Sequence, residues 1–366
     1  MIWNTVVVGA GGWGTALARL LALRGETVGL WCREPEVAED IQKNRVNQAF
    51  LPGVSLPDRV CPFTEPGRAS GAKTFFMVVP VQHMRAVSGQ FAPYIGEDAV
   101  VVNGAKGIEI GTGCRPSEIL TMTLGRDKRI LTLSGPSHAE EVGRDLPCAV
   151  VVSGRWVRVN RSVQHLLNCE TFRVYTSQDQ VGVEIAGALK NVIALAAGIA
   201  EGLGFGDNTI AALATRGLAE ITHLGEAMGA DPYTFSGLAG MGDLFATLAS
   251  EHSRNHWAGR EIGRGRSVGE LQASTNMVVE GIPTCQAALT LAERYRMEMP
   301  IVERVGAVLF GGQDPRSAVA DLMRREPSAE RIPWYKRWRG RHDKPSRSGP
   351  LASVRRRYRR YRSRAR

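Results

Sequence analysis

The most constraining feature of this sequence is a glycine-rich loop that directly follows its first apolar run. Residues Thr5–Val8 predict a short buried strand, and Gly9-Ala10-Gly11-Gly12-Trp13-Gly14 continues from it in the pattern G-x-G-x-x-G. In such a loop the first glycine permits a tight turn, the second lets a pyrophosphate approach the backbone, and the third lets the next helix pack closely on the strand. The free N–H groups of that helix, predicted to begin near Thr15, would hold the phosphates. We therefore expect Gly9, Gly11, Gly12, Trp13 and Gly14 to contact a dinucleotide.

The rest of the first half alternates between short apolar runs and helical segments. Further strands are predicted at Thr27–Trp31, Thr74–Val79, Ala99–Val102, Ile130–Leu133, Ala149–Val152 and Phe172–Tyr175. Helical spacing occurs between several of them, at Thr15–Arg24, Pro35–Lys43 and Ser117–Leu124. Runs of β-branched residues separated by helices are typical of a parallel, doubly wound α/β sheet.

Beyond about residue 180 the strand signals fade and only helices are predicted. Their ranges are Glu184–Ala200, Asn208–Met228, Thr284–Tyr295, Ile301–Phe310 and Pro315–Arg325. Asp207 is the predicted cap of the second helix, Asp231-Pro232 marks another helix start, and Ser267 with Glu270 forms a capping box. We therefore expect a sheet domain over residues 1–180, an all-α domain over 181–330, and a tail over 331–366.

The positive charge of the chain is concentrated in this tail. The whole sequence has a formal net charge of +10, which by itself suggests an acidic macromolecular partner. Residues 331–366, however, hold fifteen Lys and Arg and one acid, Asp343, so residues 1–330 carry a net charge of −4. The tail interleaves its arginines with aromatic residues, which suits contact with a polyanion. A solvated extension without a partner is the alternative.

No leader, membrane span or metal site is predicted. The N-terminus enters the apolar run Val6–Val8 without a basic leader, and the longest apolar stretch, around Ile185–Ala200, is interrupted by Lys190 and Asn191. The six cysteines are scattered without a C-x-x-C pair, and the seven histidines form no metal-binding pattern. We therefore expect reduced thiols and a soluble protein of the cytoplasm.

The end of the second predicted strand bears on which dinucleotide is bound. About twenty residues after such a loop, an NAD-binding chain usually has an acid for the ribose hydroxyls. Here the strand ends at Leu30-Trp31-Cys32-Arg33, and Glu34 comes only after the arginine. An arginine at this place suits the 2′-phosphate of NADPH, so we expect Arg33 to favour NADPH over NADH. The alternative is an ordinary surface arginine.

Five further clusters combine with the glycine loop into one pattern. They are Asn103-Gly104-Ala105-Lys106-Gly107-Ile108-Glu109, Leu133-Ser134-Gly135-Pro136-Ser137-His138-Ala139, Gly187-Ala188-Leu189-Lys190-Asn191, Gly237-Leu238-Ala239-Gly240-Met241-Gly242-Asp243 and Ser253-Arg254-Asn255. With these motifs, in collinear order from about residue 5 to Glu330, the sequence closely resembles the NAD(P)-dependent sn-glycerol-3-phosphate dehydrogenases.

The resemblance implies a fold, a reaction and an assembly. The fold is a Rossmann-type N-terminal domain followed by a helical domain like that of 6-phosphogluconate dehydrogenase, with the active site in the cleft between them. The reaction is the interconversion of dihydroxyacetone phosphate and sn-glycerol 3-phosphate with NAD(P)H and NAD(P)+. A preference for NADPH would favour making glycerol 3-phosphate for phospholipid synthesis, and a homodimer is the implied assembly.

Lys190 is the residue to which the resemblance gives the central role, that of proton donor and acceptor. It sits in an apolar run, where burial and a second nearby cation would lower a lysine pKa toward a useful range. The alternative is a lysine that extends to solvent from a half-buried helix. Lys106 follows a buried strand, at the edge where ligands of such sheets bind. The resemblance makes Lys106 a contact of substrate and cofactor that polarises the carbonyl group.

The resemblance implies the remaining contacts residue by residue. For the substrate they are Gly135, Ser137, Asp243, Ser253, Arg254 and Asn255, with Asp243 also among the catalytic residues. For the cofactor they are Ala139, Arg254, Val278 and Glu280. Ser253-Arg254-Asn255 falls at a predicted helix N-terminus, which suits a phosphate. His138 and Val81 depart from the usual phenylalanine and serine, and we expect His138 to pack or hydrogen-bond locally.

Two other interpretations remain. The 6-phosphogluconate and β-hydroxyacid dehydrogenases, and ketopantoate reductase, share the two-domain plan and a lysine on the first helix after the sheet. Their signature is typically Lys-x-x-x-Asn, whereas here Asn191 directly follows Lys190 and position 194 is Ala194, which argues against them. The non-enzyme interpretation is a nucleic-acid-binding protein that acts through its basic tail.

Overall fold

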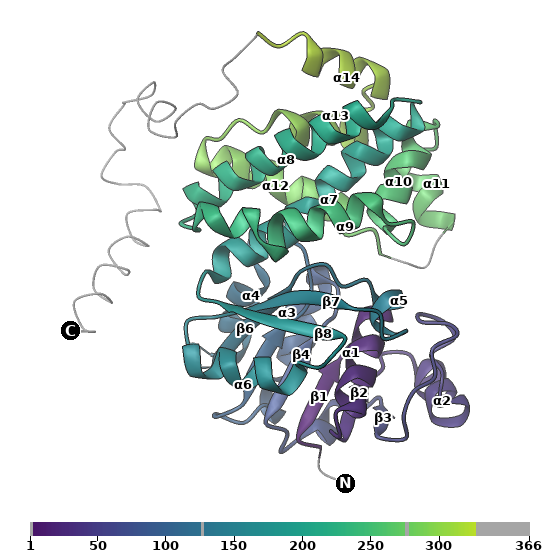
Figure 1. The fold of residues 1–366 in the computed structure, drawn as a ribbon, viewed down its shortest axis with the longest axis vertical. Helices are drawn as coiled ribbons and strands as arrows, with labels where there is room; N and C mark the ends of the chain where they lie inside the picture. Colours follow the sequence, from purple (N-terminus) through teal and green to yellow (C-terminus); the bar gives the residue numbers. More distant parts are fainter. Residues whose placement is uncertain (1–2, 126–127, 275–277, 327–366) are drawn as a thin grey trace, which may run out of the picture. The chain divides into compact units, whose positions relative to one another are not determined.

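An eight-stranded sheet forms the first half of the chain, in the order β3-β2-β1-β4-β5-β6-β7-β8 (Figure 1). The computed structural model describes residues 3–125, 128–274 and 278–326. The strands are β1 Thr5–Val8, β2 Val28–Trp31, β3 Val60–Phe63, β4 Thr74–Met77, β5 Val100–Asn103, β6 Arg129–Ser134, β7 Cys148–Ser153 and β8 Phe172–Ser177. All seven predicted strands are confirmed within a few residues at their ends.

The edge strand β3 is the one that the sequence pattern does not predict. It has four residues, and Pro62 stands among them. Because proline cannot donate to a strand ladder, it is confined to edge strands and weakens the sequence signal. Its place at the edge, paired with β2 alone, is therefore the place where such a strand is tolerated.

The prediction of a parallel sheet is wrong for one pair of strands. β7 runs antiparallel to β6, with Leu133 opposite Val152, whereas every other pair is parallel. The segment between these two strands contains only the single-turn helix α5, Ala139–Val142. A parallel crossover usually needs a full helix to carry the chain back along the sheet, so this short segment lets the chain reverse instead.

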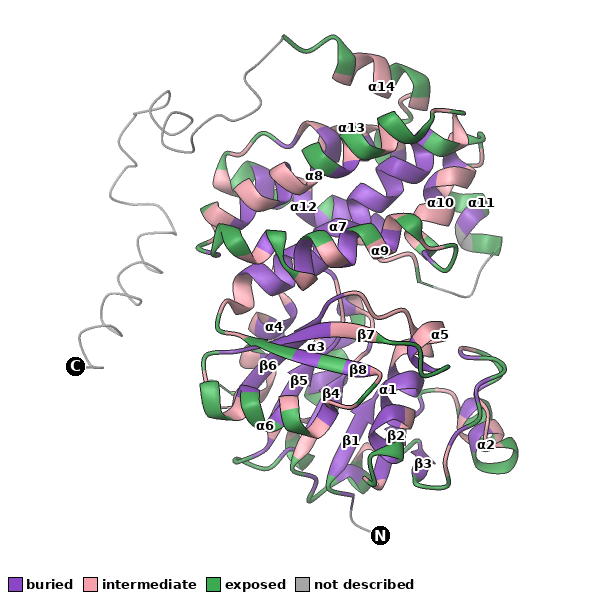
Figure 2. Ribbon diagram, viewed as in Figure 1, coloured by how far each residue is buried: buried purple, intermediate pink, exposed green. Residues whose placement is uncertain are grey.

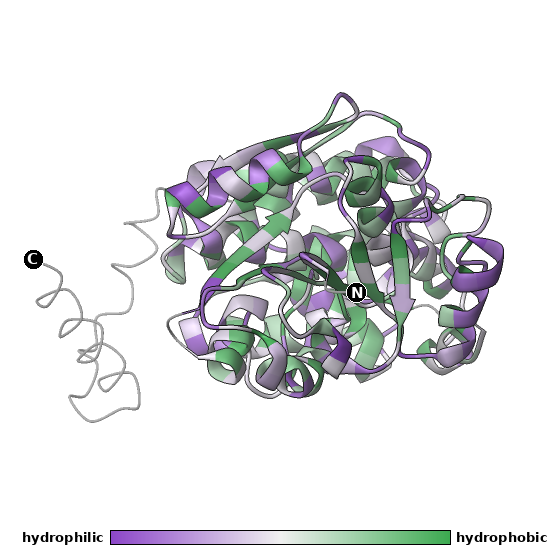
Figure 3. Cartoon of the chain, turned by 90° about the horizontal axis from the view of Figure 1, so that it is seen from below, coloured by the Kyte–Doolittle hydropathy of each residue, from purple (hydrophilic) through white to green (hydrophobic). Residues whose placement is uncertain are grey.

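Helices cover both faces of the sheet, as a doubly wound fold requires. They are α1 Gly12–Leu23, α2 Pro35–Asn44, α3 Val81–Phe91, α4 Pro116–Leu124 and α6 Val157–Leu167, with short 3-10 turns at Pro66–Ala69 and Ala92–Tyr94. Apolar residues of α1, α2 and α6 pack in one core, and those of α3 and α4 in another. The buried strands lie between these helices, whose outer sides are exposed (Figure 2), and the strands are the hydrophobic centre of this half (Figure 3).

The second half consists of helices around one long buried helix. They are α7 Gln180–Gly202, α8 Asp207–Ala227, α9 Asp243–Ala249, α10 Arg254–Gly263, α11 Val268–Ser274, α12 Gly281–Tyr295, α13 Pro300–Gly311 and α14 Pro315–Met323. A 3-10 turn at Pro232–Ser236 and a π-turn at Leu238–Gly242 precede α9. The all-α prediction for this half is confirmed over the described residues, and the predicted tail lies outside them.

The central helix α7 is enclosed by its neighbours, and its residues are mostly apolar on all sides. Every residue from Gly182 to Ala200 is buried, and α8, α9, α10, α12 and α13 pack around it (Figure 2). Its length and composition would allow it to cross a membrane, but the apolar window is wholly buried within the fold. An all-round apolar helix in such a place is the core helix of its domain.

Glycines bring α7 and α10 into direct backbone contact. A Cβ atom on Gly198 or Gly202 of α7 would lie 2.1 or 2.2 Å from the carbonyl oxygen of His256 or Arg260. On the other helix, a Cβ atom on Gly259 would lie 2.2 Å from the carbonyl oxygen of Leu195. No larger residue fits such a contact, so these glycines fix the separation of the two helices that carry Lys190 and the Ser253-Arg254-Asn255 segment.

The predicted helix starts are confirmed at two places and corrected at two others. Ser267 and Glu270 form the expected reciprocal capping box, and Asp231 caps the turn that begins at Pro232. Asp207, however, is the first residue of α8 and its cap is Gly206. The helix predicted near Thr15 begins at Gly12, so the last glycines of the loop already belong to its first turn.

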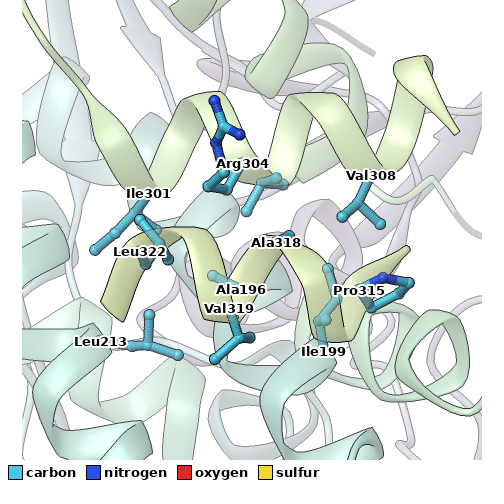
Figure 4. A pocket seen from close by; sticks show the side chains of 11 residues that line it. Ala196, Ile199, Leu213, Ile301, Arg304, Val308, Pro315, Ala318, Val319 and Leu322 are labelled. Carbon is cyan, nitrogen blue, oxygen red and sulfur yellow. The ribbon is translucent and has the colours of Figure 1, made fainter. Parts of the chain in front are cut away.

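A small cavity lies between the last two described helices and the core. It has a volume of about 30 Å³ and is lined mainly by apolar side chains of α7, α8, α13 and α14, among them Ile199, Leu213, Val308 and Leu322 (Figure 4). A volume of this size holds about one water molecule. None of its lining residues is a predicted site residue, so this cavity has no part in the site described next.

Candidate active site

The glycine loop lies where the order of the strands reverses. Strands β2 and β3 lie on one side of β1. Strand β4 lies on the other side of β1, followed in order by the remaining strands. Gly9 has φ = +115°, and a Cβ atom on Gly14 would lie 1.9 Å from the Gly9 carbonyl oxygen. Gly11 caps α1 with no side-chain bond, and nothing lies within 4 Å of its would-be Cβ. The space beside Gly11 at the start of α1 is therefore open, and it lies at the switch point of the sheet, which is the usual position of a dinucleotide.

Trp13 and Ala139 lie beside this loop. The would-be Cβ of Gly104, just after β5, lies 3.1 Å from Trp13 Nε1, and the Trp13 ring stacks on Phe172 with the centroids 6.5 Å apart. The Cβ of Ala139 is 3.5 Å from the would-be Cβ of Gly12. Trp13 thus lies close to the end of β5, and Ala139 lies close to the glycine loop.

Arg33 follows β2, close to the start of the glycine loop. The backbone N–H of Gly9 donates to the carbonyl oxygen of Trp31, two residues before Arg33, at 3.2 Å. The guanidinium is 70% exposed and pairs with the carboxylate of Glu34. An ion pair this exposed contributes little to stability, so Arg33 is free to exchange this partner for an anion of higher charge.

Three of the predicted residues meet in one buried cluster of charges. The carboxylate of Asp243 accepts from Lys190 Nζ at 2.5 Å through Oδ1 and from Lys106 Nζ at 2.7 Å through Oδ2. Lys190 and Asp243 are 6% and 1% exposed. Lys106 also donates to the Gly135 carbonyl oxygen at 3.0 Å. Residues 137 positions apart in the sequence are thereby joined around one carboxylate.

Each member of the cluster comes from a different element. Lys190 lies in the middle of α7, Lys106 in the loop after β5, and Asp243 at the first position of α9, directly after the π-turn. The cap of α9 is Gly242 rather than Asp243, so the Asp243 side chain is not used to cap its own helix. It is free to bind both lysines.

Thr247 completes the environment of Lys190, and sequence reasoning missed it. Its hydroxyl donates to the Asp243 carbonyl oxygen at 2.6 Å and accepts from Lys190 Nζ at 2.5 Å. Thr247 follows Asp243 by four residues in α9, so the two side chains share one face of the helix. That spacing is the signal that would have found it.

The surroundings of Lys190 set its acidity. Burial lowers the pKa of Lys190 to about 7, Asp243 opposes this shift, and the positive charge of Lys106 adds to it. Among the described residues, Asp243 and Thr247 accept hydrogen bonds from two of the three N–H groups of the Lys190 ammonium. One N–H is left for a ligand, on a group that gains and loses a proton near neutral pH.

The Gly135-Pro136-Ser137 turn borders the cluster. The Ser137 hydroxyl donates to the Gly135 carbonyl oxygen at 3.1 Å, the same oxygen that Lys106 contacts. His138 Nε2 lies 3.3 Å from the carbonyl oxygen of Ala246 in α9, as the expectation of a local hydrogen bond requires. Because a carbonyl oxygen can only accept, Nε2 is the donor in this contact. Burial and the charge of Lys190 lower the pKa of His138.

The Ser253-Arg254-Asn255 segment begins α10, as predicted. Ser253 is the cap, and its hydroxyl accepts from the His256 N–H at 3.3 Å. Asn255 bonds to Asn191 and to the backbone of Gly281. Arg254 is exposed, so of the three side chains it is the one directed away from the protein interior.

Glu280 and Val278 lie at the start of α12. Burial raises the pKa of Glu280 to about 7. The hydrogen bond with the Val81 N–H and the charge of Arg254 both act in the opposite direction and lower this pKa. Its Oε2 atom is buried with no hydrogen-bond partner among the described residues, and it lies 3.2 Å from the would-be Cβ of Gly107. Such an orphaned acceptor is a place where a bound group would supply the missing donor. Val278 is 40% exposed.

Fold and site together define a class of protein. An open glycine loop at the switch point of the sheet suits a nicotinamide dinucleotide. A buried lysine with a pKa of about 7 beside a second lysine suits proton transfer to or from an oxygen that becomes charged. The combination is that of a dinucleotide-dependent dehydrogenase.

Comparison with known proteins names the family. Residues 4–158 match the family described as the N-terminus of NAD-dependent glycerol-3-phosphate dehydrogenase, and residues 179–320 match its C-terminus. The chain belongs to the NAD-dependent glycerol-3-phosphate dehydrogenase family. It is 49% identical over 333 residues to the NAD(P)+-dependent glycerol-3-phosphate dehydrogenase of Pelotomaculum thermopropionicum, which covers 90% of this chain and 95% of the relative. The relative of the same name from Carboxydothermus hydrogenoformans is 48% identical over 89% of this chain and 98% of its own.

Comparison with solved structures supports the same family. The glycerol-3-phosphate dehydrogenase of Coxiella burnetii has a TM-score of 0.84 at 33% identity, covering 88% of this chain and 99% of that one. A ketopantoate reductase from Ralstonia solanacearum has a TM-score of 0.53 at 14% identity, over 88% of this chain and 99% of that one, which shows a shared fold alone. The Rossmann-type sheet and the helical second half are thus the fold of this family.

Proposed function

We propose that this chain interconverts dihydroxyacetone phosphate and sn-glycerol 3-phosphate with NAD(P)H and NAD(P)+. The observation that carries the proposal is the Lys106–Asp243–Lys190 cluster, formed where the two halves of the family's fold meet. Family membership and close relatives named for this activity support the same substrate pair.

The nicotinamide dinucleotide fits the open glycine loop and supplies the hydride when bound. In the reduction, Lys190 donates the proton to the substrate oxygen through its remaining N–H, and in the oxidation it takes that proton back. Lys106 stabilises the negative charge that develops on this oxygen. Asp243 and Thr247 hold the Lys190 ammonium in place, so that its remaining N–H has a fixed orientation.

The substrate phosphate is assigned to the segment around Arg254. The guanidinium of Arg254 and the N-terminus of α10 offer positive charge and free N–H groups, the chemistry that binds a phosphate dianion. Gly135 and Ser137 lie beside Lys106 and suit the rest of the substrate. Ala139, Val278 and Glu280 are proposed to border the cofactor, where a donor on the bound cofactor would satisfy the orphaned oxygen of Glu280.

The activity is tested with the purified full-length chain. Dihydroxyacetone phosphate should drive the oxidation of NADPH and NADH, followed by the loss of nicotinamide absorbance, and the product should be sn-glycerol 3-phosphate. Ketopantoate is the comparison substrate, since a ketopantoate reductase shares the fold. Turnover of ketopantoate at a higher kcat/KM than dihydroxyacetone phosphate would reject the proposal.

Arg33 is proposed to select NADPH. Exchanging Glu34 for the 2′-phosphate gives Arg33 a doubly charged partner, and such a bond is worth about 1.5 kcal/mol, or roughly tenfold in affinity. We expect Arg33→Ala to lower the NADPH-to-NADH ratio of kcat/KM by about tenfold. Lys43→Ala, which removes an exposed cation of α2, should leave this ratio unchanged. An unchanged ratio in Arg33→Ala would show that Arg33 is an ordinary surface residue.

The cellular setting is proposed on the same grounds. An NADPH preference favours the direction that makes glycerol 3-phosphate, which would supply phospholipid synthesis in the cytoplasm. A homodimer is the assembly that the family resemblance implies, and the mass of the purified protein in solution tests it. The boundary between the two domains is proposed near residue 180, at the start of α7.

The basic tail, residues 331–366, is proposed to contact a polyanion. Its fifteen Lys and Arg against one acid support this, because each basic side chain that meets a phosphate releases a counterion. The full chain and a 1–330 truncation should differ in binding to RNA and to anionic vesicles at about 0.15 M salt. Equal binding by both chains would show that the tail is a passive extension.

A further inference from the structure

The side chain of Asn255 lies where three helices of the site meet. Its Nδ2 donates to Asn191 Oδ1 in α7 at 3.0 Å, and its Oδ1 accepts from the Gly281 N–H at the start of α12 at 2.8 Å. Because a backbone N–H can only donate, the atom that faces Gly281 must be the oxygen, and this fixes the orientation of the amide. The oxygen and one N–H of the Asn255 amide are therefore bonded within the protein, and its second N–H has no hydrogen-bond partner among the described residues.

This junction is closely packed as well as hydrogen-bonded. A Cβ atom on Gly281 would lie 2.7 Å from the Asn191 carbonyl oxygen and 2.8 Å from Asn255 Oδ1. Asn191 is 5% exposed. The first turn of α12 thus rests directly on α7 and on the Asn255 side chain, with no space for a shifted arrangement.

Each residue of the junction is adjacent in sequence to a residue of the proposed site. Asn191 follows Lys190, Asn255 follows Arg254, and Gly281 follows Glu280. Lys190 is the proposed proton donor, Arg254 the proposed phosphate contact and Glu280 the proposed cofactor contact. A displacement at the junction therefore reaches all three.

We propose that Asn255 is a positioning residue that joins the cofactor side of the site to the lysine and to the phosphate end. This inference rests on the proposed function for the identity of the ligands. The geometry carries it, since a side chain whose oxygen and one amide N–H are already bonded to α7 and α12 has its orientation fixed by the protein. Removing it frees the Gly281 N–H and loosens the start of α12.

Binding of NADPH without substrate separates the two roles. In Asn255→Ala, we expect the Kd of NADPH, measured from its fluorescence, to rise by about five- to tenfold, and kcat with dihydroxyacetone phosphate to fall by a similar factor. A side chain that only contacts the substrate would instead raise KM and leave the Kd of NADPH unchanged. That second result would overturn the proposal. Because no substrate is present, the binding assay remains decisive even if the substrate assignment were wrong.

Two further variants make the test specific. Asn191→Ala removes the other half of the junction, so it should weaken NADPH binding to the same degree, and the double variant should be no worse than the weaker-binding single variant. Independent, additive losses would overturn the proposal. Asn208→Ala, an exposed asparagine in the first turn of α8, should leave both the Kd of NADPH and kcat unchanged. Unfolding temperatures of all variants confirm that the folded protein is compared.

Discussion

A variant in which alanine replaces Lys190 is expected to lose about a thousandfold in kcat, because a positioned proton donor is worth about 10² to 10⁴ in rate. The remaining carboxylate of Asp243 keeps its bond to Lys106, so the loss concerns the proton rather than the fold. Initial rates of dihydroxyacetone phosphate reduction at saturating NADPH measure it. A loss of less than about tenfold would show that another group transfers the proton.

Two controls separate proton transfer from packing. Lys190→Arg restores a positive charge, but a guanidinium does not release its proton in this pH range, so this variant should stay inactive. A small primary amine added to Lys190→Ala should restore part of the rate, because it can occupy the vacated space beside Asp243. Restored activity in Lys190→Arg would mean that only the charge matters.

Replacement of Asp243 by asparagine is the second large change. It removes the only negative charge between Lys106 and Lys190 among the described residues, and two ammonium groups then repel each other in a buried site. Because Asp243 opposes the lowering of the Lys190 pKa, its loss should bring this pKa still lower. At neutral pH Lys190 is then mostly deprotonated, so reduction should fall by about a hundredfold.

The two directions of the reaction respond differently to this variant. Glycerol 3-phosphate oxidation needs the neutral amine, which Asp243→Asn retains, so its rate should fall less than that of reduction. Asp98→Asn, at a carboxylate that is 95% exposed, is the matched control and should leave both rates unchanged. Equal losses in both directions would show that Asp243 acts only through the fold.

Most of the fold follows from local patterns in the sequence. Runs such as Val6–Val8 predict strands because β-branched residues suit a buried sheet, and the glycine loop predicts the position of α1. The orientation of β7 does not follow, since it depends on how little helix the preceding segment can form. Pro62 weakens the strand pattern of β3, and hydrophobic spacing does not distinguish α3 and α6 from loops.

The site follows from sequence only in part. The motifs and the family resemblance together name Lys106, Lys190 and Asp243, but not the bonds between them, since these join residues up to 137 positions apart. The contact of Asn191 escapes because a buried amide has no local signature until its partner is known. Thr247 is missed although its spacing of four residues after Asp243 in one helix is a local signal. The packing role of the glycines in α7 and α10 is likewise visible only once the two helices are known to be in contact.

The central claim is that Lys190, with its pKa lowered to about 7 by burial, carries the proton in both directions. The most direct test is the pH dependence of kcat/KM for each direction between about pH 6 and pH 9. Reduction needs the ammonium, so its kcat/KM should fall above about pH 7 by roughly tenfold per pH unit. Oxidation needs the amine, so its kcat/KM should rise through the same pH and level off above it. In Asp243→Asn both midpoints should move to lower pH. Profiles without a midpoint near pH 7, or midpoints that Asp243→Asn leaves in place, would contradict the assignment of Lys190.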